Sequence, residues 1–580
     1  MLRRRLQALL VLTLLATAQI HAADRRATLA SRIDHLLSDP DVARGFWGID
    51  IVSLSTGKTV LARNEDKLFT PASNTKLFTT AAAFALIGSD YRFHTTVETT
   101  ANLDKHGRLS GDLVLVGRGD PNLSGRILPY NLRTERTLPA VKVLEDLADE
   151  LVRKGLKFVD GDIVADDSYF AFERYGEGWS QDDLVWGDGA PVSALTINDN
   201  VVFVSILPAD RAGDRAFVSV LPFADYYQID NRIITTPQGT GGRKIFINRE
   251  PGSRLLMLWG NVPVDDPGAN EALAIEDPAD YASQLFRNLL ERRGVVVYGR
   301  VRAHHTELAN LATLSVTSLA SARGGGDTSQ PSSPQPLVLA TYASQPLSED
   351  LRVINKVSQN LHAELLLRLL GREKGTAGTI EGGQEVLRGF ITQAGISPDE
   401  YIFYDGSGLS RQNLVTPRAI ARLLQYAAKQ PWSARYQDTL PVAGVDGSLA
   451  DRFKGTPAAG RVTAKTGSLS HVNVLSGYAT TLSGERLAFS VMSNNHHLLP
   501  KRALDTIDQI VLPSSKTNNL CYLGARARCR TDAVAARPGP VLVGGLRMPS
   551  NNSFNTAALL WSGCLEANSR VSFLRSRDRS

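Results

Sequence analysis

Thr70-Pro71-Ala72-Ser73-Asn74-Thr75-Lys76 leads into a run of apolar residues on a helical period. Thr70 can cap a helix here, and Pro71 suits its first helical position. Ser73 and Lys76 are then one helical turn apart and face the same side. A serine hydroxyl is a poor nucleophile until a nearby base takes its proton, and Lys76 is placed to be that base. We therefore predict a nucleophilic Ser73 in the first turn of a buried helix.

Two further motifs follow in order along the chain, Ser358-Gln359-Asn360 and Lys465-Thr466-Gly467. Each motif alone is weak evidence, because Ser55 to Lys58 repeats the Ser-x-x-Lys spacing. That second copy lies at a glycine turn in residues 46–62, where two alternating runs predict a β-hairpin. Only the helical pair can share a proton directly. The ordered set of three motifs is the pattern of class A β-lactamases and penicillin-binding proteins.

Additional segments make the pattern more specific, namely Asp405-Gly406-Ser407-Gly408-Leu409-Ser410-Arg411, Gly187-Asp188-Gly189-Ala190-Pro191-Val192-Ser193-Ala194-Leu195 and Gly119-Asp120-Pro121. With them, the chain closely resembles the class C low-molecular-mass penicillin-binding proteins, the D-alanyl-D-alanine carboxypeptidase/endopeptidase family. The resemblance covers roughly Asp34 to Leu512. Ser73 and Ser358 are much further apart than one compact acyl-transfer domain requires, which indicates a large insertion between the first two motifs.

The resemblance implies an α+β fold with a β-lactamase/transpeptidase-like domain, in which helices flank an antiparallel sheet. Two β-rich domains are inserted into its sequence. We expect the following ranges: 1–22 signal peptide; 23–90 and 306–512 transpeptidase-like domain; 91–200 and 262–305 inserted domain II; 201–261 inserted domain III; 513–580 arginine-rich, poorly ordered tail.

The chain pattern gives some local expectations. Between about residues 91 and 305, short β-like runs predominate and long helical patterns are few. Helical periodicity returns over 347–370 and 381–393. A buried strand is expected at 486–493, and a flexible loop rich in Gly, Ser and Pro at 323–336.

The catalytic assignments follow from chemistry and the resemblance together. Lys76 must be neutral often enough to act as general base, and burial beside a second cation, Lys465, would lower its pKa. Lys465 would also attract the substrate's terminal carboxylate. The backbone N–H groups of Ser73 and Ser468 would form the oxyanion hole.

The second and third motifs would complete the site. Ser358 would relay a proton to the departing D-alanine, and Asn360 would hold the peptide amide. Thr466 would bind the terminal carboxylate, while Gly467 lets the strand backbone approach the substrate closely. No metal or organic cofactor is required by this chemistry.

Other residues have weaker assignments. Many relatives have Asp where this chain has Gln359, and we interpret the change as tolerated. Arg411 could meet an acidic group of the stem peptide or be a plain surface arginine. By family analogy, Asp166 and Phe170 would contact substrate. The histidine pairs 304–305 and 496–497 are interpreted as exposed loop residues rather than metal ligands, and the Asp405 segment as either a site rim or a tight turn.

Charge and targeting signals bear on the compartment. Lys and Arg are concentrated at the two ends of the chain, and the body between them is mildly acidic, so nucleic acid is not an expected partner. Residues 1–22 combine a basic start, a short apolar run and small residues, which predicts a cleaved signal peptide and a periplasmic location. All three cysteines fall after residue 513, and no function is assigned to them.

The expected function is a serine-type D-Ala-D-Ala carboxypeptidase and DD-endopeptidase acting on peptidoglycan peptides through an acyl-enzyme at Ser73. β-Lactam antibiotics would be covalent inhibitors. Two alternatives remain: a β-lactamase or esterase on the same scaffold, and an inactive wall-binding protein. The balance of the two peptidase activities, peripheral membrane association and the oligomeric state are left open.

Overall fold

The computed structural model describes residues 29–126, 139–222, 226–308 and 335–515. The predicted signal peptide, most of the loop at 323–336 and the tail from residue 516 lie outside the described residues. No helix in the described part of the chain is both long and apolar enough to span a bilayer.

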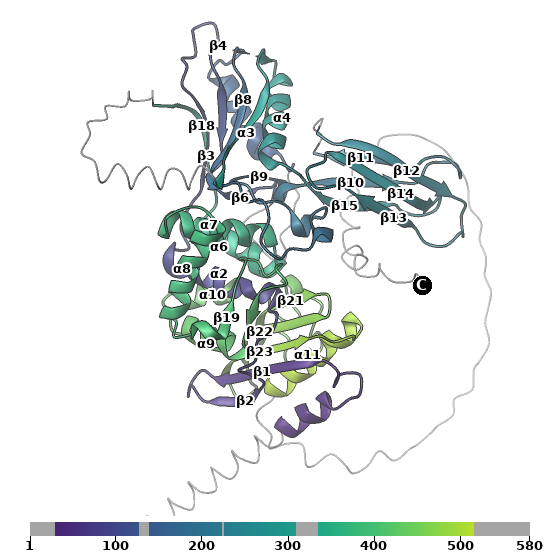
Figure 1. The fold of residues 1–580 in the computed structure, drawn as a ribbon, viewed down its shortest axis with the longest axis vertical. Helices are drawn as coiled ribbons and strands as arrows, with labels where there is room; N and C mark the ends of the chain where they lie inside the picture. The colour runs from purple at the N-terminus through teal and green to yellow at the C-terminus, as the bar shows by residue number, and fades with distance from the viewer. Residues whose placement is uncertain (1–28, 127–138, 223–225, 309–334, 516–580) are drawn as a thin grey trace, which may run out of the picture. The chain divides into compact units, whose positions relative to one another are not determined.

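A five-stranded antiparallel sheet joins the two ends of the described chain (Figure 1). Its strand order is β2-β1-β23-β22-β21. The strands are β1 (Phe46–Ser53), β2 (Thr59–Arg63), β21 (Val462–Leu469), β22 (Val472–Thr480) and β23 (Arg486–Asn494). The predicted hairpin and the predicted strand at 486–493 are both confirmed. β21 is an edge strand, so some of its backbone N–H and C=O groups are not used in pairing with another strand of this sheet.

The two faces of this sheet pack against different helices. One face forms an apolar core with helical residues 29–37 and α11 (Pro500–Ser515). Helix α11 continues to Ser515, so its last three residues lie within the range expected for the tail. The other face packs against a helical layer: α2 (Thr75–Leu86), α6 (Leu347–Arg352), α7 (Asn360–Lys374), α8 (Ile380–Gln393), α9 (Pro417–Ala427) and α10 (Ser433–Asp438).

The helix predicted over 347–370 is interrupted at the second motif. A π-helical turn at Val353–Val357 follows α6, and Ser358 then adopts φ 70°, in the left-handed region. Gln359 returns to extended backbone and caps α7. Periodicity missed this break because apolar residues continue through it, and its consequence is that Ser358 and Asn360 are presented at a helix start.

A second five-stranded sheet has the order β17-β8-β5-β3-β18. Its strands are β3 (His94–Thr99), β5 (Leu113–Val116), β8 (Ile163–Ala171), β17 (Val301–Thr306) and β18 (Leu337–Ala343). Four of its strands come from the expected insertion, but β18 pairs with β3 although it lies in the range 306–512 assigned to the transpeptidase-like domain. Two helices pack with this sheet, α3 (Lys142–Arg153) and α4 (Pro278–Glu291). The expectation that the inserted region is rich in short strands with few long helices is therefore confirmed, although these two helices, which bury an apolar stripe against the sheet, were not individually predicted.

Smaller sheets complete the insertion. One three-stranded sheet contains β10 (Val201–Leu207), β11 (Phe217–Leu221) and β15 (Ala269–Ala274), and another β12 (Gln228–Thr236), β13 (Lys244–Asn248) and β14 (Leu255–Pro263). β4 (Arg108–Leu109), β7 (Phe158–Val159) and β16 (Val296–Val297) form a third. β6 (Asp120–Leu123) pairs with β9 (Leu195–Ile197), and β19 (Tyr401–Ile402) with β20 (Leu414–Val415).

These sheets bear on the expected domain ranges. β15 follows residue 262 but pairs along its length with β10, so the sheet of β10 and β11 draws a strand from the range assigned to domain II. Buried residues from this sheet, the β12–β14 sheet and α4 belong to one apolar cluster. The exact division between domains II and III stays a prediction.

Candidate active site

Ser73 lies in a short 3-10 turn, Ala72–Asn74, that leads directly into α2. The turn is not capped as expected, because Pro71 precedes it and no side chain caps it. The backbone N–H of Thr70 instead donates to Asn494 Oδ1 at 2.7 Å. Ala72 has φ 45°, a left-handed conformation that is rare for alanine. Tertiary contacts, rather than a local cap, therefore fix the position of Ser73.

Lys76 is fully buried, and its ammonium group reaches the Ser73 hydroxyl. Lys76 Nζ lies 2.9 Å from Ser73 Oγ, 2.7 Å from Asn360 Oδ1 and 2.6 Å from the carbonyl oxygen of Ser407. The first and second motifs therefore meet at one amine. Because three oxygens surround it, the amine is held in the one direction that suits proton exchange with Ser73.

Burial lowers the pKa of Lys76 to about 8, while the charges of Asp405, Glu364 and Asp188 act in the opposite direction. The pKa of Lys465 is lowered well below its ordinary value, first by burial and then by the charge of Lys76. We expected Lys465 to lower the pKa of Lys76. Burial is the larger cause, and the repulsion between the two ammonium groups acts on Lys465. Either way, a neutral Lys76 is accessible near neutral pH.

Lys465 brings the third motif to the second. Its Nζ lies 2.8 Å from Ser358 Oγ and 2.9 Å from the carbonyl oxygen of Thr466. The amide of Asn74, next to Ser73, donates to the backbone carbonyl of Lys465 at 3.4 Å. The structure thus brings the three sequence motifs together around one set of hydroxyl and amine groups.

Strand β21 passes close beside the serine turn. A Cβ added to Gly467 would lie 3.0 Å from the backbone nitrogen of Ser73 and 2.4 Å from Val474 Cγ2, so only glycine fits without displacement. Thr466 Oγ1 is 2.7 Å from Ser448 Oγ, and Ser468 Oγ accepts a hydrogen bond from Asn473 Nδ2 at 2.9 Å. Ser448 could not be predicted from the sequence, because it lies outside the three motifs and only the fold brings it to Thr466.

The inserted region contributes a wall to the site. Asn360 Nδ2 donates to the backbone carbonyl of Asp188 at 2.9 Å. The Asp188 side chain keeps an exposed surface, yet the protein around it raises its pKa and the charge of Lys76 lowers it. The Asp188 carbonyl therefore links the inserted region to Asn360 of the second motif.

The Asp405 segment is a tight turn that also shapes the site. The Asp405 carboxylate accepts hydrogen bonds from the N–H groups of Gly408 at 2.8 Å and Ser410 at 2.7 Å, and from Trp179 Nε1 at 3.0 Å. The buried carboxylate of Glu364 holds the N–H of Ser407 at 2.8 Å. These contacts direct the Ser407 carbonyl towards Lys76. The segment is therefore both a tight turn and a part of the site, which are the two interpretations left open by the sequence.

The weaker assignments have other contacts. Arg411 is exposed, and its guanidinium lies 3.7 Å from Asp183. Asp166 accepts the N–H of Ser168 at 2.8 Å and contacts His304 Nδ1 at 3.0 Å. Phe170 is only 2% exposed, and its ring lies against the backbone of the glycines at positions 119 and 378. Substrate contact by Arg411, Asp166 and Phe170 stays a prediction.

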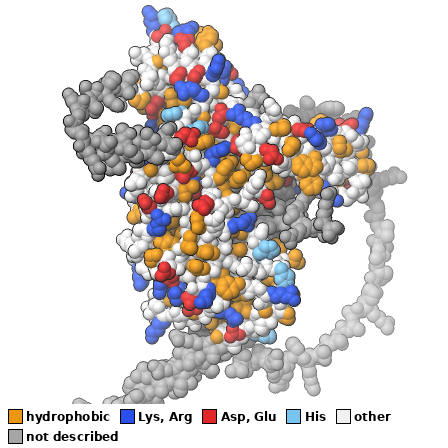
Figure 2. All heavy atoms as spheres, in the orientation of Figure 1, with side chains coloured by type: hydrophobic (Ala, Val, Ile, Leu, Met, Phe, Trp, Pro, Cys, Tyr) orange, Lys and Arg blue, Asp and Glu red, His pale blue; other side chains and the backbone are white. Residues whose placement is uncertain are grey.

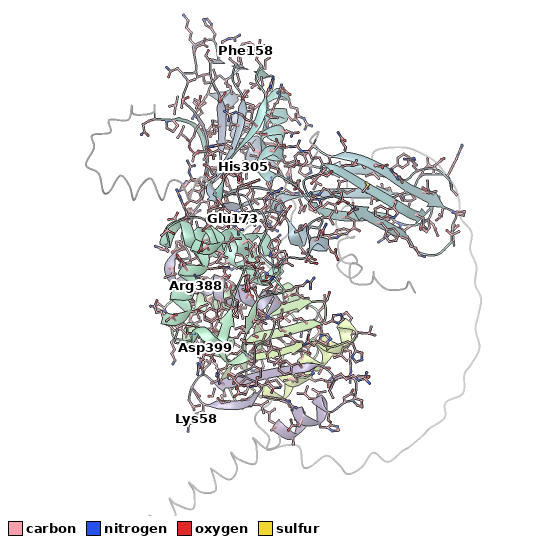
Figure 3. All side chains as sticks on the ribbon, in the orientation of Figure 1. Lys58, Phe158, Glu173, His305, Arg388 and Asp399 are labelled. Atoms are coloured by element: carbon pink, nitrogen blue, oxygen red, sulfur yellow. The ribbon has the colours of Figure 1, made fainter. Side chains whose placement is uncertain are left out.

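The histidine pairs are not simple exposed loop residues. His305, labelled in Figure 3, is on β17, where its ring nitrogens lie 2.7 Å from Asp167 and 3.3 Å from Asp277. His496 is buried and contacts Asn473 Oδ1 at 2.9 Å through Nε2. The expectation was therefore wrong for these two residues, because their acidic or amide partners come from distant segments.

Comparison with known proteins places this geometry in a family. The sequence matches the D-Ala-D-Ala carboxypeptidase 3 (S13) family over residues 29–322 and 325–516. The chain belongs to that family. It is 34% identical to the D-alanyl-D-alanine carboxypeptidase of Actinomadura sp. (strain R39) over 502 residues, covering 84% of this chain and 85% of the relative. It is 28% identical to penicillin-sensitive carboxypeptidase A of Dictyostelium discoideum, covering 81% and 87% of the two chains.

A solved structure shows the same fold. The crystal structure of penicillin binding protein 4 from Haemophilus influenzae matches with a TM-score of 0.69 and 24% identity, covering 83% of this chain and 99% of that one. The family resemblance, the α+β fold class and the enzyme class predicted from the motifs are confirmed. This S13 family member is a D-Ala-D-Ala carboxypeptidase.

Proposed function

We propose that this S13 carboxypeptidase cleaves D-alanyl-D-alanine bonds of peptidoglycan stem peptides through an acyl-enzyme at Ser73. The observation that carries the proposal is the 2.9 Å contact between Lys76 Nζ and Ser73 Oγ, with the lysine buried and the serine accessible. A buried lysine with a lowered pKa can take the serine proton as the hydroxyl attacks.

In the acylation step, Ser73 Oγ attacks the carbonyl carbon of the penultimate D-alanine, and Lys76 Nζ takes the hydroxyl proton. The negative charge that develops on the carbonyl oxygen faces the backbone N–H groups of Ser73 and Ser468. The close approach of Gly467 to the Ser73 nitrogen supports this arrangement. The C–N bond then breaks, and the departing amine of D-alanine receives a proton through the Ser358 hydroxyl.

Binding of the terminal carboxylate is assigned to the third motif. The ammonium of Lys465 lies next to the Ser358 hydroxyl, and Thr466 follows Lys465 on β21, at the end of the substrate that leaves. A carboxylate bound there would favour the charged form of Lys465 and so oppose the effect of burial on its pKa. Asn360 holds the peptide amide, and water hydrolyses the ester to release the shortened peptide.

Labelling with a fluorescent penicillin tests the proposal. A protein lacking residues 1–22 should carry the label on the peptide that contains Ser73, and Ser73→Ala should abolish it. Ser55→Ala is the matched control, because it removes the serine of the other Ser-x-x-Lys sequence, at the β1–β2 turn where Figure 3 labels Lys58. Label on another peptide, or none, would contradict the proposal.

Incubation with purified muropeptides distinguishes the activities. Mass spectrometry should show loss of one D-alanine from pentapeptides, and opening of D-alanyl cross-links if endopeptidase activity is present. Rapid turnover of nitrocefin would favour the β-lactamase alternative, and peptidoglycan binding without D-alanine release would favour an inactive wall-binding protein.

We also propose that the protein is exported to the periplasm, where its substrate lies. The basic and apolar start of the chain supports this location. Fractionation of cells, followed by sequencing of the mature N-terminus, should find the protein in the periplasmic fraction and cleaved near residue 22.

A further inference from the structure

Asp199 is a buried carboxylate of the inserted region that contacts the second catalytic motif. It is 1% exposed. Its Oδ2 accepts a hydrogen bond from Gln359 Nε2 at 2.9 Å, and its Oδ1 accepts one from Arg126 Nη1 at 2.6 Å. Arg126 makes a second contact, through Nη2 with Asp199 Oδ2, so the ion pair is bidentate.

Gln359 uses both ends of its amide. While Nε2 donates to Asp199, Oε1 accepts a hydrogen bond from the backbone N–H of Leu361 at 3.1 Å and so caps α7. A glutamine can donate and accept at once, whereas an ionised carboxylate can only accept. The residue that departs from the common family pattern is therefore matched to an acidic partner.

The backbone on both sides of this contact is held in left-handed conformations. Ser358 has φ 70°, and Asn198, Asp199 and Asn200 have φ values of 52°, 55° and 53°. Such conformations are uncommon for residues other than glycine, although Asn and Asp adopt them more readily than most, and surrounding contacts fix them. The Asp199–Gln359 hydrogen bond joins the two segments, and Ser358 and Asn360 flank Gln359 directly.

The charged groups around Asp199 come from several elements. His362, on α7, is fully buried, with Nε2 3.2 Å from Asp199 Oδ1 and Nδ1 2.6 Å from Asp350 Oδ1. The two carboxylates raise the pKa of His362 against the effect of its burial. Asp120, on β6, is also buried, and its pKa is raised to about 7 by burial and by the charge of Asp350. Asp199 therefore faces the guanidinium of Arg126 and the imidazole of His362, and Asp350 and Asp120 are the acids next to that imidazole.

We propose that Asp199 and Gln359 are positioning residues, through which the inserted region fixes Ser358 and Asn360 in the geometry that acylation requires. The inference rests on the proposed acyl-enzyme at Ser73. It makes the inserted region a part of the catalytic apparatus, since a side chain from it orients the motif that supplies the proton relay.

The test replaces Gln359 by a side chain whose donor depends on pH. In Gln359→Glu, an ionised carboxylate would face Asp199 and repel it, whereas the protonated form can again donate to Asp199 and accept from Leu361. We expect the acylation rate constant with labelled penicillin, divided by the wild-type value at the same pH, to be about one tenth or less at pH 9. The ratio should rise towards one as the pH falls to 5.5.

Two matched variants complete the design. Gln359→Met has a similar length but neither donor nor acceptor, so its ratio should stay low at every pH. Glu276→Gln weakens another buried ion pair of the inserted region, with Arg174 and Arg249, and should leave the ratio near one. It therefore measures the effect of destabilising the inserted region alone.

A ratio for Gln359→Glu that does not change with pH, at any level, would overturn the inference, as would a ratio near one for Gln359→Met. Failure of the proposed function looks different, because wild-type protein would then carry no label on Ser73. Thermal melting of each variant at both ends of the pH range establishes that folded protein is compared.

Discussion

Lys76 and Lys465 are two fully buried lysines, and the pKa of Lys465 is lowered first by burial and then by the charge of Lys76. Only neutral Lys76 can accept the Ser73 proton. Because its pKa is lowered to about 8, a larger fraction of Lys76 is neutral near pH 7 than for an ordinary lysine. Substrate carboxylate arriving at Lys465 would change that balance, so the two lysines should be considered as a pair.

The pH dependence of acylation follows from the state of Lys76. The rate constant for labelling Ser73 with penicillin should rise with pH and level off above a midpoint near 8, because the protonated amine below that pH cannot act as a base. Stopped-flow or quenched labelling between pH 6 and 9.5 measures it. Lys76→Arg, which stays protonated, should be slower by about 10²- to 10⁴-fold at every pH. A flat wild-type profile would contradict the assignment of Lys76 as base.

A substitution at Gly467 tests how closely β21 approaches the serine turn. Gly467→Ala should slow acylation about tenfold or more, because the new methyl group would meet Val474 and the Ser73 nitrogen and would push β21 away from the serine turn. Gly389→Ala is the control, since that α8 glycine has open space around a Cβ, and its melting temperature should stay equal or increase. Equal acylation rates for both variants would count against a close approach of β21.

At the scale of elements, the Asp405 turn connects backbone geometry with the chemistry of Lys76. Its carboxylate is the hydrogen-bond acceptor around which residues 405–410 fold, and its charge raises the pKa of Lys76. Asp405→Asn should move the midpoint of the acylation pH profile to lower pH, because an electrostatic stabilisation of the ammonium is lost. The melting temperature should also fall. A midpoint that moves upward would show that another effect dominates.

The catalytic side chains of the site could be predicted from the sequence, whereas the backbone groups that hold them could not. Ser73, Lys76 and Lys465 could be predicted because their side chains carry the chemistry and recur in fixed order. The carbonyl groups of Ser407 and Asp188, which hold Lys76 and Asn360, could not be predicted, since every residue has a carbonyl and no residue type marks the one that is used.

Helices α3 and α4 were missed for a different reason. The N-terminal signal of α4 was present, because Asp277 caps it by accepting the N–H of Asp280 and Pro278 follows. In α3, Leu144, Leu147 and Leu151 recur on a helical period. The many short strands around both helices made the surrounding region read as β-rich. Gln359 illustrates a further limit, because its partner Asp199 is distant in sequence and only the fold brings the two together.

At the scale of the molecule, charged side chains of both signs are interspersed over the face shown in Figure 2. Within the insertion, some charged groups form specific contacts between distant segments. His305 lies between Asp167 and Asp277, and hydrogen bonds with these carboxylates raise its pKa to about 10, against the effect of burial. In an unfolded chain the pKa of histidine is about 6.5.

This difference in pKa predicts the pH dependence of stability. A group with a raised folded-state pKa contributes stability that is fully present below pH 6.5 and is lost as the pH rises towards 10. The melting temperature of wild-type protein should therefore exceed that of His305→Gln most at pH 6, and the difference should shrink by pH 9.5. Scanning calorimetry at several pH values measures it. A difference that grows with pH would contradict the ion pairing of His305.

The pairing of β1 with β23 has a consequence for biosynthesis. These neighbours in one sheet are contributed by opposite ends of the described chain, and Asn494, at the end of β23, also holds the backbone of Thr70 just before the serine turn. Lys465, too, is synthesised long after Ser73. Since a chain emerges from the ribosome in order, a partly made polypeptide would contain the hydroxyl but lack the late strands that support it. We therefore expect Ser73 to become reactive towards acyl donors only after these late strands have been made and have paired with β1.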